Sequence, residues 1–252
     1  MNIFRNENTI TMKYYMPFLF LFVLIPGHAQ KDFQSKFSTE ELAEAPVKLI
    51  PYPQEVTWGN GTTKIEAVAV EMGPEIGANI EKEMKKVLAE TGVQDLETAE
   101  KKLSFIQDKE LPEEGYRLLI EPDHIQIYAS GEAGYFYALQ SLRQLAVGAG
   151  DFQLARITDS PAHGVRGFLL DVGRNYVSLP TLKGLLDEMA RYKLNVFQWH
   201  LTDRPAWRIE SRVHPELTAA ENHRETRDPG KFYTYDEIRE IIEYASERQI
   251  QV

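Results

Sequence analysis

The sequence predicts an α+β domain over residues 47–155, followed by an α/β region over residues 164–252. In the first region, strand-like runs and two amphipathic helical runs follow the order strands, helix, strands, helix. After Asp159-Ser160-Pro161 the pattern changes, because near-continuous apolar runs now alternate with amphipathic helices. Such apolar runs are typical of strands in a parallel sheet that is covered on both faces.

The first region contains clear local signals of turns and helix ends. Asn60-Gly61 separates two strand-like runs and predicts a hairpin. Apolar residues recur at helical spacing from Ile76 to Leu88, and a glycine such as Gly92 is typical of a helix end. The other elements expected here are strands over 68–72, 102–106, 115–121 and 124–129, the last two forming a hairpin, and a helix over 131–147.

The second region reads β-α-β-α-β, which predicts a parallel sheet with right-handed crossovers. Its strands are expected over 167–172, 194–201 and 249–252, and the first of them should be buried on both faces. Ser178 predicts the start of the first helix, and Thr234 with Glu237 forms a capping-box spacing at the second. A (β/α)8 TIM barrel typically takes about 250 residues, so the region is either a small open sheet or the start of an incomplete TIM barrel. The lack of a C-terminal cap after the last strand favours the barrel.

The N-terminus carries the three parts of a signal peptide. Lys13 precedes the apolar run 16–26, and the small residues that follow predict cleavage after Ala29. Residues 1–29 are therefore expected to be removed on export to a periplasmic or extracellular location, with residues 30–46 as a linker. The alternative is a buried N-terminal helix. The run is too short for a transmembrane helix, which needs about 20 apolar residues.

Composition argues against several classes of function. The net charge of −10 makes nucleic acid an unexpected partner, since an acidic surface repels phosphate. The absence of cysteine excludes disulfides, thiolate metal sites and a lipid anchor at the cleavage site, so no stable membrane anchor is expected. His214 and His223 lack metal-ligand spacing, and the sequence has no phosphate-binding loop. We therefore expect neither a metal nor a cofactor.

Polar and aromatic residues follow the first two strands of the second region. Asp171 and Arg174 come at the end of one strand, and His200, Asp203 and Trp207 come at the end of the next. In a parallel barrel, such positions point into the active site. Charges and aromatic rings together suit a sugar, which offers apolar CH faces and many hydroxyls. The alternative is that Asp171 and Arg174 form a structural ion pair and that Trp207 belongs to the core.

Two segments in this region resemble the start of the catalytic barrel of the family 20 glycoside hydrolases, the β-N-acetylhexosaminidases. They read GVRGFLLDVGRNY (164–176) and YKLNVFQWHLTD (192–203). Upstream, LIPYPQEV, EEGYRL and GEAGYFYALQSLRQL resemble the N-terminal companion domain of that family. The resemblance implies release of terminal β-linked GlcNAc or GalNAc, and hence a glycan containing N-acetylhexosamine as the partner.

The resemblance also implies roles for single residues. Arg174 matches the residue that binds sugar hydroxyls in the −1 subsite, where its planar fork suits two adjacent hydroxyls. Asp203 matches the carboxylate that supports the catalytic acid through a neighbouring histidine, and His200 is expected close behind it. Asp171 and Trp207 are expected at the substrate. Arg204-Pro205-Ala206 replaces the Asp-Gln-Gly of many members, which changes the rim of the site.

Family members use substrate-assisted retaining catalysis, in which the acetamido oxygen of the substrate attacks the anomeric carbon. The assisting Asp-Glu pair ends the fourth barrel strand of the family, and this sequence extends only into the third. Asp187-Glu188 and Asp236-Glu237 are predicted to be structural helix residues, so no catalytic residue is expected in this chain and no activity in this chain alone. The alternatives are a related exo-glycosidase that shares the N-terminal domain and a non-catalytic sugar-binding protein.

Overall fold

The computed structural model describes residues 37–252, apart from 75, 205 and 223–227. The predicted signal peptide and residues 30–36 of the predicted linker lie outside the described residues. The next part of that segment is not irregular, because Thr39–Glu44 form helix α1 with a capping box between Ser38 and Glu41. None of the helices described for the chain has the length and apolar character needed to cross a membrane.

A mixed sheet forms the first region, with the strand order β1-β8-β5-β6-β4-β2-β3 and β7 paired to β8. The parallel pairs join β3, β2, β4 and β6, and the antiparallel pairs join β6, β5, β8, β1 and β7. The strands are β1 (Glu55–Lys64), β2 (Ala67–Glu71), β3 (Gln94–Asp95), β4 (Lys102–Gln107), β5 (Tyr116–Ile120), β6 (His124–Ala129), β7 (Ala146–Gly148) and β8 (Asp151–Asp159).

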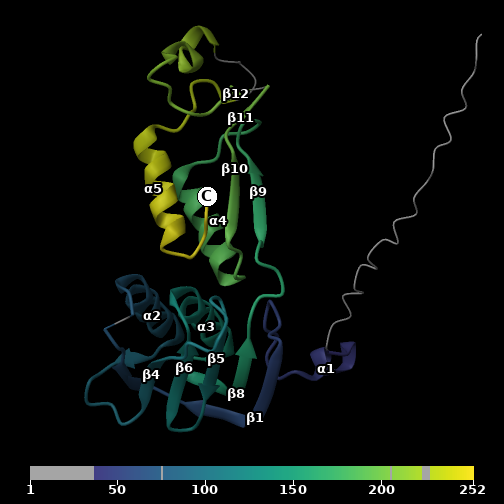
Figure 1. The fold of residues 1–252 in the computed structure, drawn as a ribbon, viewed down its shortest axis with the longest axis vertical. Helices are drawn as coiled ribbons and strands as arrows, with labels where there is room; N and C mark the ends of the chain where they lie inside the picture. Colours follow the sequence, from purple (N-terminus) through teal and green to yellow (C-terminus); the bar gives the residue numbers. More distant parts are fainter. Residues whose placement is uncertain (1–36, 75, 205, 223–227) are drawn as a thin grey trace, which may run out of the picture. The chain divides into compact units, whose positions relative to one another are not determined.

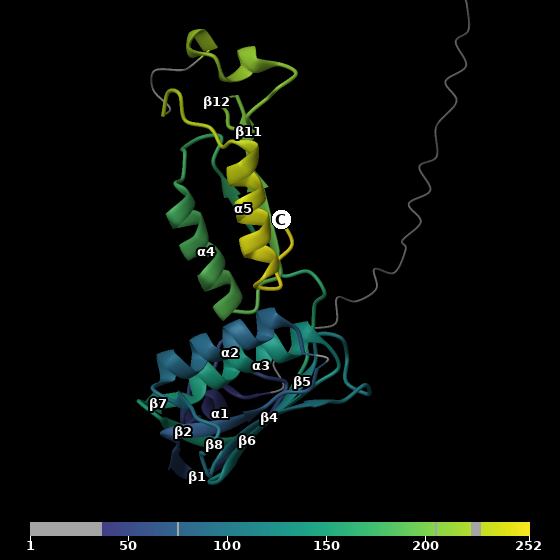
Figure 2. The same cartoon turned by 90° about the vertical axis from the view of Figure 1, so that its left-hand side faces the viewer.

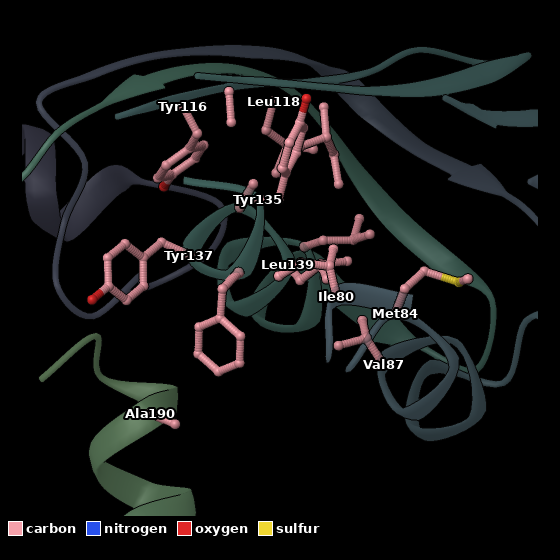
Figure 3. Packing of buried hydrophobic residues seen from close by; sticks show 14 of the residues in the cluster. Ile80, Met84, Val87, Tyr116, Leu118, Tyr135, Tyr137, Leu139 and Ala190 are labelled. Carbon is pink, nitrogen blue, oxygen red and sulfur yellow. The ribbon is translucent and has the colours of Figure 1, made fainter. Parts of the chain in front are cut away.

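Helices α2 (Ala78–Thr91) and α3 (Glu132–Leu145) lie on one face of this sheet (Figure 1 and Figure 2). Alternate side chains of β5 are buried on that face, and Figure 3 shows Tyr116 and Leu118 in one cluster with side chains of α2 and α3. α3 lies close to the sheet, because a Cβ at Gly134 would come within 2.3 Å of the Gly115 carbonyl oxygen. We call the region from β1 to β8 the α+β layer; it agrees with the predicted fold class.

Two details of the α+β layer differ from the sequence-based expectation. The predicted hairpin at Asn60-Gly61 is wrong, since both flanking runs belong to β1 and pair with β8 across a register shift between Trp58 and Thr62. Gly61 has a φ of 76°, which a glycine adopts without strain in such an irregularity. Strand β8 itself was not expected, although it lies between β1 and β5 in the sheet.

The second region, which we call the β/α segment (residues 163–252), has the predicted alternation. β9 (Gly167–Asp171) and β10 (Val196–His200) pair in parallel, as expected, and Gln251 adds a parallel bridge to Val196. Helices α4 (Leu179–Arg191) and α5 (Tyr235–Ser246) run beside these strands (Figure 1), and the capping box at the start of α5 is confirmed. Between β10 and α5 lie β11 (Thr202–Asp203), β12 (Ala206–Trp207) and the short 3₁₀ helices η1 (Pro215–Thr218) and η2 (Ala220–Asn222).

Burial of β9 differs from the prediction that both of its faces are covered. Phe168 and Leu169 are 40% and 51% exposed. In the structure β9 pairs with β10, and only Leu170 of its apolar side chains packs against the core that includes Leu182, Leu186 and Ile241. The described residues therefore bury the apolar side chains of β9 only in part.

The α+β layer and the β/α segment are joined by a polar seam of five residues: Glu114, Tyr116, Asp159, Arg166 and Lys193. The Arg166 guanidinium donates to both Glu114 carboxylate oxygens, at 2.8 and 3.1 Å. The buried Lys193 ammonium donates to the Tyr116 hydroxyl at 2.8 Å and to Asp159 Oδ2 at 3.1 Å. Arg166 and Lys193 precede β9 and β10, so the seam lies at the amino ends of these strands.

Candidate functional site

Parallel pairing brings the carboxyl ends of β9 and β10 to one edge. The register places His200 beside Asp171, and the amides of Val172 and Gly173 both donate to the His200 carbonyl oxygen, at 3.1 and 3.3 Å. A Cβ at Gly173 would lie 2.9 Å from the Asp203 amide nitrogen. Gly173 therefore allows the turn after β9 to approach the turn after β10 closely.

Arg174 joins the two strand ends. Its Nε donates to Asp171 Oδ2 at 2.7 Å, and its Nη2 donates to Asp203 Oδ2 at 3.0 Å. The Arg174 amide also donates to Asp171 Oδ1 at 3.0 Å, which fixes the turn between the two residues. The Asp171–Arg174 ion pair, which the sequence left as the alternative to a binding role, is thus present, and it extends to Asp203 on the neighbouring strand end.

Asp203 is the acceptor shared by most of the cluster. Its Oδ1 accepts from the Arg204 amide at 2.6 Å, and its Oδ2 lies 3.3 Å from His200 Nε2. The Arg204 amide, followed by the His200 hydrogen bond and the charge of Arg174, lowers the pKa of Asp203 below its usual value. Asp203 is therefore a carboxylate at neutral pH, suited to orient a histidine or a guanidinium.

The cluster of Asp171, Arg174, His200 and Asp203 is open to solvent. The Arg174 side chain is 58% exposed, so its planar fork is accessible to a ligand with adjacent hydroxyls. Asp171, His200 and Asp203 also bring ligand atoms within 4.8 Å of one another, a spacing that could hold a metal ion. Arg174 already uses oxygens of both carboxylates, so a cation would compete with its guanidinium.

The structure does not bring Trp207 into this cluster. The β11–β12 ladder pairs Thr202 with Trp207 and Asp203 with Ala206, which puts Trp207 and Asp203 on opposite faces. The Trp207 indole nitrogen donates to the Ile209 carbonyl oxygen at 2.7 Å. The ring is partly exposed rather than core, and its contact with a substrate stays a prediction.

An aromatic group beside the turn that follows β9 was not predicted from the sequence. Tyr233 stacks on Tyr176 with ring centroids 4.8 Å apart and meets Trp199 edge-on at 4.6 Å. The Tyr233 hydroxyl donates to the Val177 carbonyl oxygen at 2.6 Å. Burial raises the pKa of Tyr233 to about 12, so its hydroxyl stays protonated. These rings support the turn that follows β9, and the sequence signal was an aromatic residue directly before the capping box of α5.

Arg208 was also missed. It directly follows the predicted Trp207, but it is buried and donates hydrogen bonds to three backbone carbonyls in two other segments, at Val172 and at residues 228–231. The structure places both Asp-Glu pairs in helices, where one residue of each makes a structural contact. Asp187 accepts from Arg248 Nε at 2.7 Å, and Glu237 completes the capping box of α5.

Comparison with known proteins agrees with this arrangement. "Glycosyl hydrolase family 20, domain 2" matches residues 47–160, and "Glycosyl hydrolase family 20, catalytic domain" matches residues 163–252. A β-hexosaminidase of Porphyromonas gingivalis is 39% identical over 155 residues, which are 56% of this chain and 20% of the relative.

Solved structures with the same arrangement include two enzymes of this class. The β-N-acetylhexosaminidase of Bacteroides fragilis has a TM-score of 0.70 at 32% identity, covering 82% of this chain and 43% of its own. The exo-β-N-acetylglucosaminidase of Vibrio harveyi, solved in complex with N-acetylglucosamine, has a TM-score of 0.71 at 26% identity, covering 80% of this chain and 35% of its own.

Both matched domains are those of a glycoside hydrolase. The chain belongs to glycoside hydrolase family 20. It spans about a fifth to a third of the length of the curated relatives it matches.

Proposed function

We propose that the protein carrying this chain is a β-N-acetylhexosaminidase that releases terminal N-acetylhexosamine from glycans. The observation that carries the proposal is the position of Arg174, which spans Asp171 and Asp203 at the carboxyl ends of two parallel strands and remains accessible. The names of the relatives support the reaction, and the N-acetylglucosamine complexes of the Vibrio harveyi and Streptomyces plicatus enzymes support the sugar.

The finer fold belongs to the same proposal. β9, α4, β10, α5 and the bridge at Gln251 are the first elements of a (β/α)8 barrel, in which carboxyl strand ends form the active site. In this arrangement Arg174 binds sugar hydroxyls, Asp203 supports the catalytic acid through a histidine, and the Asp-Glu pair of the family comes from a later strand. The acetamido group of the substrate then acts as the nucleophile.

Export is part of the proposal as well. Lys13, the apolar run 16–26 and the small residues before Gln30 support removal of residues 1–29 and a periplasmic or extracellular location. Mass spectrometry of the mature N-terminus decides this point. A mature protein that still begins at Met1 or Met12 would contradict export by this signal.

The reaction is tested by hydrolysis of the p-nitrophenyl β-GlcNAc glycoside. We expect turnover by the full-length protein and none by residues 1–252, because general acid catalysis alone is worth about 10²- to 10⁴-fold. Arg174→Ala in the full-length protein should lower kcat/KM by about 10- to 100-fold, the equivalent of one hydrogen bond from a charged group. Arg156→Ala, which removes an exposed arginine paired with Glu121 on the α+β layer, is the matched control and should leave kcat/KM unchanged.

One observation favours a non-catalytic sugar-binding protein as the second candidate. Arg204-Pro205-Ala206 departs from the common family sequence directly beside Asp203. A full-length protein that binds GlcNAc but releases no p-nitrophenol would support that candidate and contradict the enzymatic proposal. Turnover by residues 1–252 alone would show that the catalytic groups are placed wrongly.

A further inference from the structure

Arg208 is a buried cation that donates side-chain hydrogen bonds to three backbone carbonyl oxygens. Its side chain is 2% exposed. Nε donates to the Val172 carbonyl oxygen at 3.1 Å, and Nη1 donates to the carbonyl oxygens of Asp228 and Lys231 at 3.0 and 2.7 Å. The Asp228 carboxylate is more distant, with Oδ2 3.9 Å from Nη2. The guanidinium therefore connects the segment of Arg208 to the turn after β9 and to residues 228–231.

The backbone of Arg208 adds two further connections. Its amide donates to the Leu201 carbonyl oxygen at 3.1 Å, and its carbonyl oxygen accepts from the Tyr233 amide at 2.9 Å. One residue thus contacts the turn after β9, the end of β10 and the segment that leads into α5. These are the elements that form and support the candidate site.

The segment around Asp228 also contacts the turn that carries Arg174. Asp228 Oδ2 accepts from the Tyr176 amide at 2.9 Å, while the Val172 carbonyl held by Arg208 lies between Asp171 and Arg174 in the chain. Arg208 consequently holds the 171–176 turn directly at one end and through Asp228 at the other. The hydrogen bonds from this turn to β10 end at Gly173, so among the described residues strand pairing does not fix the rest of the turn.

Arginine is the side chain that this arrangement requires. Its planar fork donates in several fixed directions at once, whereas a lysine ammonium is a compact charge on a flexible stem. A neutral side chain of similar volume would leave the buried Val172 carbonyl oxygen, and the part-buried carbonyl oxygens of Asp228 and Lys231, without this donor, which is costly.

We propose that Arg208 is a positioning residue for sugar binding, acting through Arg174. It holds the 171–176 turn against the end of β10, so that the Arg174 guanidinium reaches both Asp171 and Asp203 and faces the ligand in one orientation. This inference rests on the function proposed above. Arg208 itself is buried and does not contact the sugar.

A double-mutant cycle in the full-length protein tests the coupling. Arg208→Met should raise KM for the p-nitrophenyl β-GlcNAc glycoside and lower kcat/KM by about 10²-fold, the effect expected for misplacing a binding group by about 1 Å. In the Arg174→Ala background the same change should cause little further loss, since the group that it positions is already absent. Full additivity of the two losses would contradict the proposal.

Arg248→Met is the matched control. Arg248 is also a buried arginine, but it connects α4 to α5 by donating to Asp187 Oδ1 and to the Tyr244 carbonyl oxygen. We expect it to lower thermal stability and to leave KM unchanged, so a general loss of stability is distinguished from loss of positioning. If Arg248→Met raises KM as much as Arg208→Met does, the positioning role of Arg208 is wrong.

Amide hydrogen exchange of the 252-residue chain tests the structural step without enzymatic activity. Arg208→Met should speed exchange of the Val172, Gly173 and Tyr176 amides, whereas Arg248→Met should not. Arg208→Lys, which keeps the charge and most of the volume, replaces Arg208→Met if that variant fails to fold, and should show the same change in smaller degree. Unchanged exchange would overturn the inference, whereas an inactive wild-type enzyme with the expected exchange pattern would overturn the proposed function alone.

Discussion

Strand β5 of the α+β layer and strand β9 of the β/α segment are similarly apolar but differ in burial. In β5, Tyr116, Leu118 and Ile120 are buried beneath α3, whereas Phe168 and Leu169 of β9 are largely exposed. An apolar run thus predicts a strand, but whether its side chains are buried depends on the helices and strands that pack against it. The difference also separates two roles, since the α+β layer has the closed core and the β/α segment carries the clustered charges at its strand ends.

The first test of this comparison removes Lys193, one of the two cations that join the regions. Lys193→Met leaves the Asp159 carboxylate buried without its cation, which should lower the free energy of unfolding by about 3–5 kcal/mol. Urea denaturation of the 252-residue chain measures the loss. Lys183→Met, which removes an exposed pair with Glu240, is the control and should cost less than about 1 kcal/mol. Equal losses would mean that the seam does not stabilise the chain.

The second test compares one leucine from each region. Leu118→Ala creates a cavity under α3 and should cost about 2–5 kcal/mol. Leu169→Ala removes a side chain that is already half-exposed and should change stability by no more than about 0.5 kcal/mol. Urea denaturation of both variants measures the difference. Similar losses would show that Leu169 is buried in solution, by contacts that the described residues do not make.

The third and smallest effect concerns the acid stability of the seam. Partial burial raises the pKa of Glu114, but the hydrogen bonds and charge of Arg166 outweigh it, so the pKa lies below its usual value. The unfolded chain therefore takes up the proton first, and the stabilisation is present above about pH 4.5 and lost as the pH falls through the lowered pKa.

Glu114→Gln should make the free energy of unfolding less dependent on pH below this value. The change should be under about 1 kcal/mol, because the pair is partly exposed and screened by water. Urea denaturation at a series of pH values measures the slope, with the exposed neighbour in Glu113→Gln as the control. An identical slope in wild type and Glu114→Gln would remove Glu114 from the acid response.

Local signals explain which parts of the fold were predictable. The helix end at Gly92, the capping box at Thr234 and the β5–β6 hairpin depend on neighbouring residues, and all three are present. β8 was missed because its place between β1 and β5 depends on pairing with strands distant in sequence. Asn60-Gly61 was misread for the same reason, since β8 pairs with the residues on both sides of it.

The candidate site was likewise predictable where it depends on local signals and not where it depends on long-range contacts. Asp171, Arg174, His200 and Asp203 directly follow two recognisable strands, so parallel pairing alone brings them together. Arg208 could not be found in this way, because its partners at Val172, Asp228 and Lys231 are defined only by the folded backbone. Trp207 shows the converse, since it follows Asp203 closely in sequence but the β11–β12 pairing places the two side chains on opposite faces of the ladder.

The buried contact of Lys193 has a consequence for biosynthesis. A chain leaves the ribosome N-terminal end first, and domains generally fold as units in that order. Tyr116 and Asp159 both lie in the α+β layer and precede Lys193, so both hydrogen-bond acceptors of its ammonium are synthesised before β10. We therefore expect the α+β layer to fold first and to bind the later region at the amino end of β10.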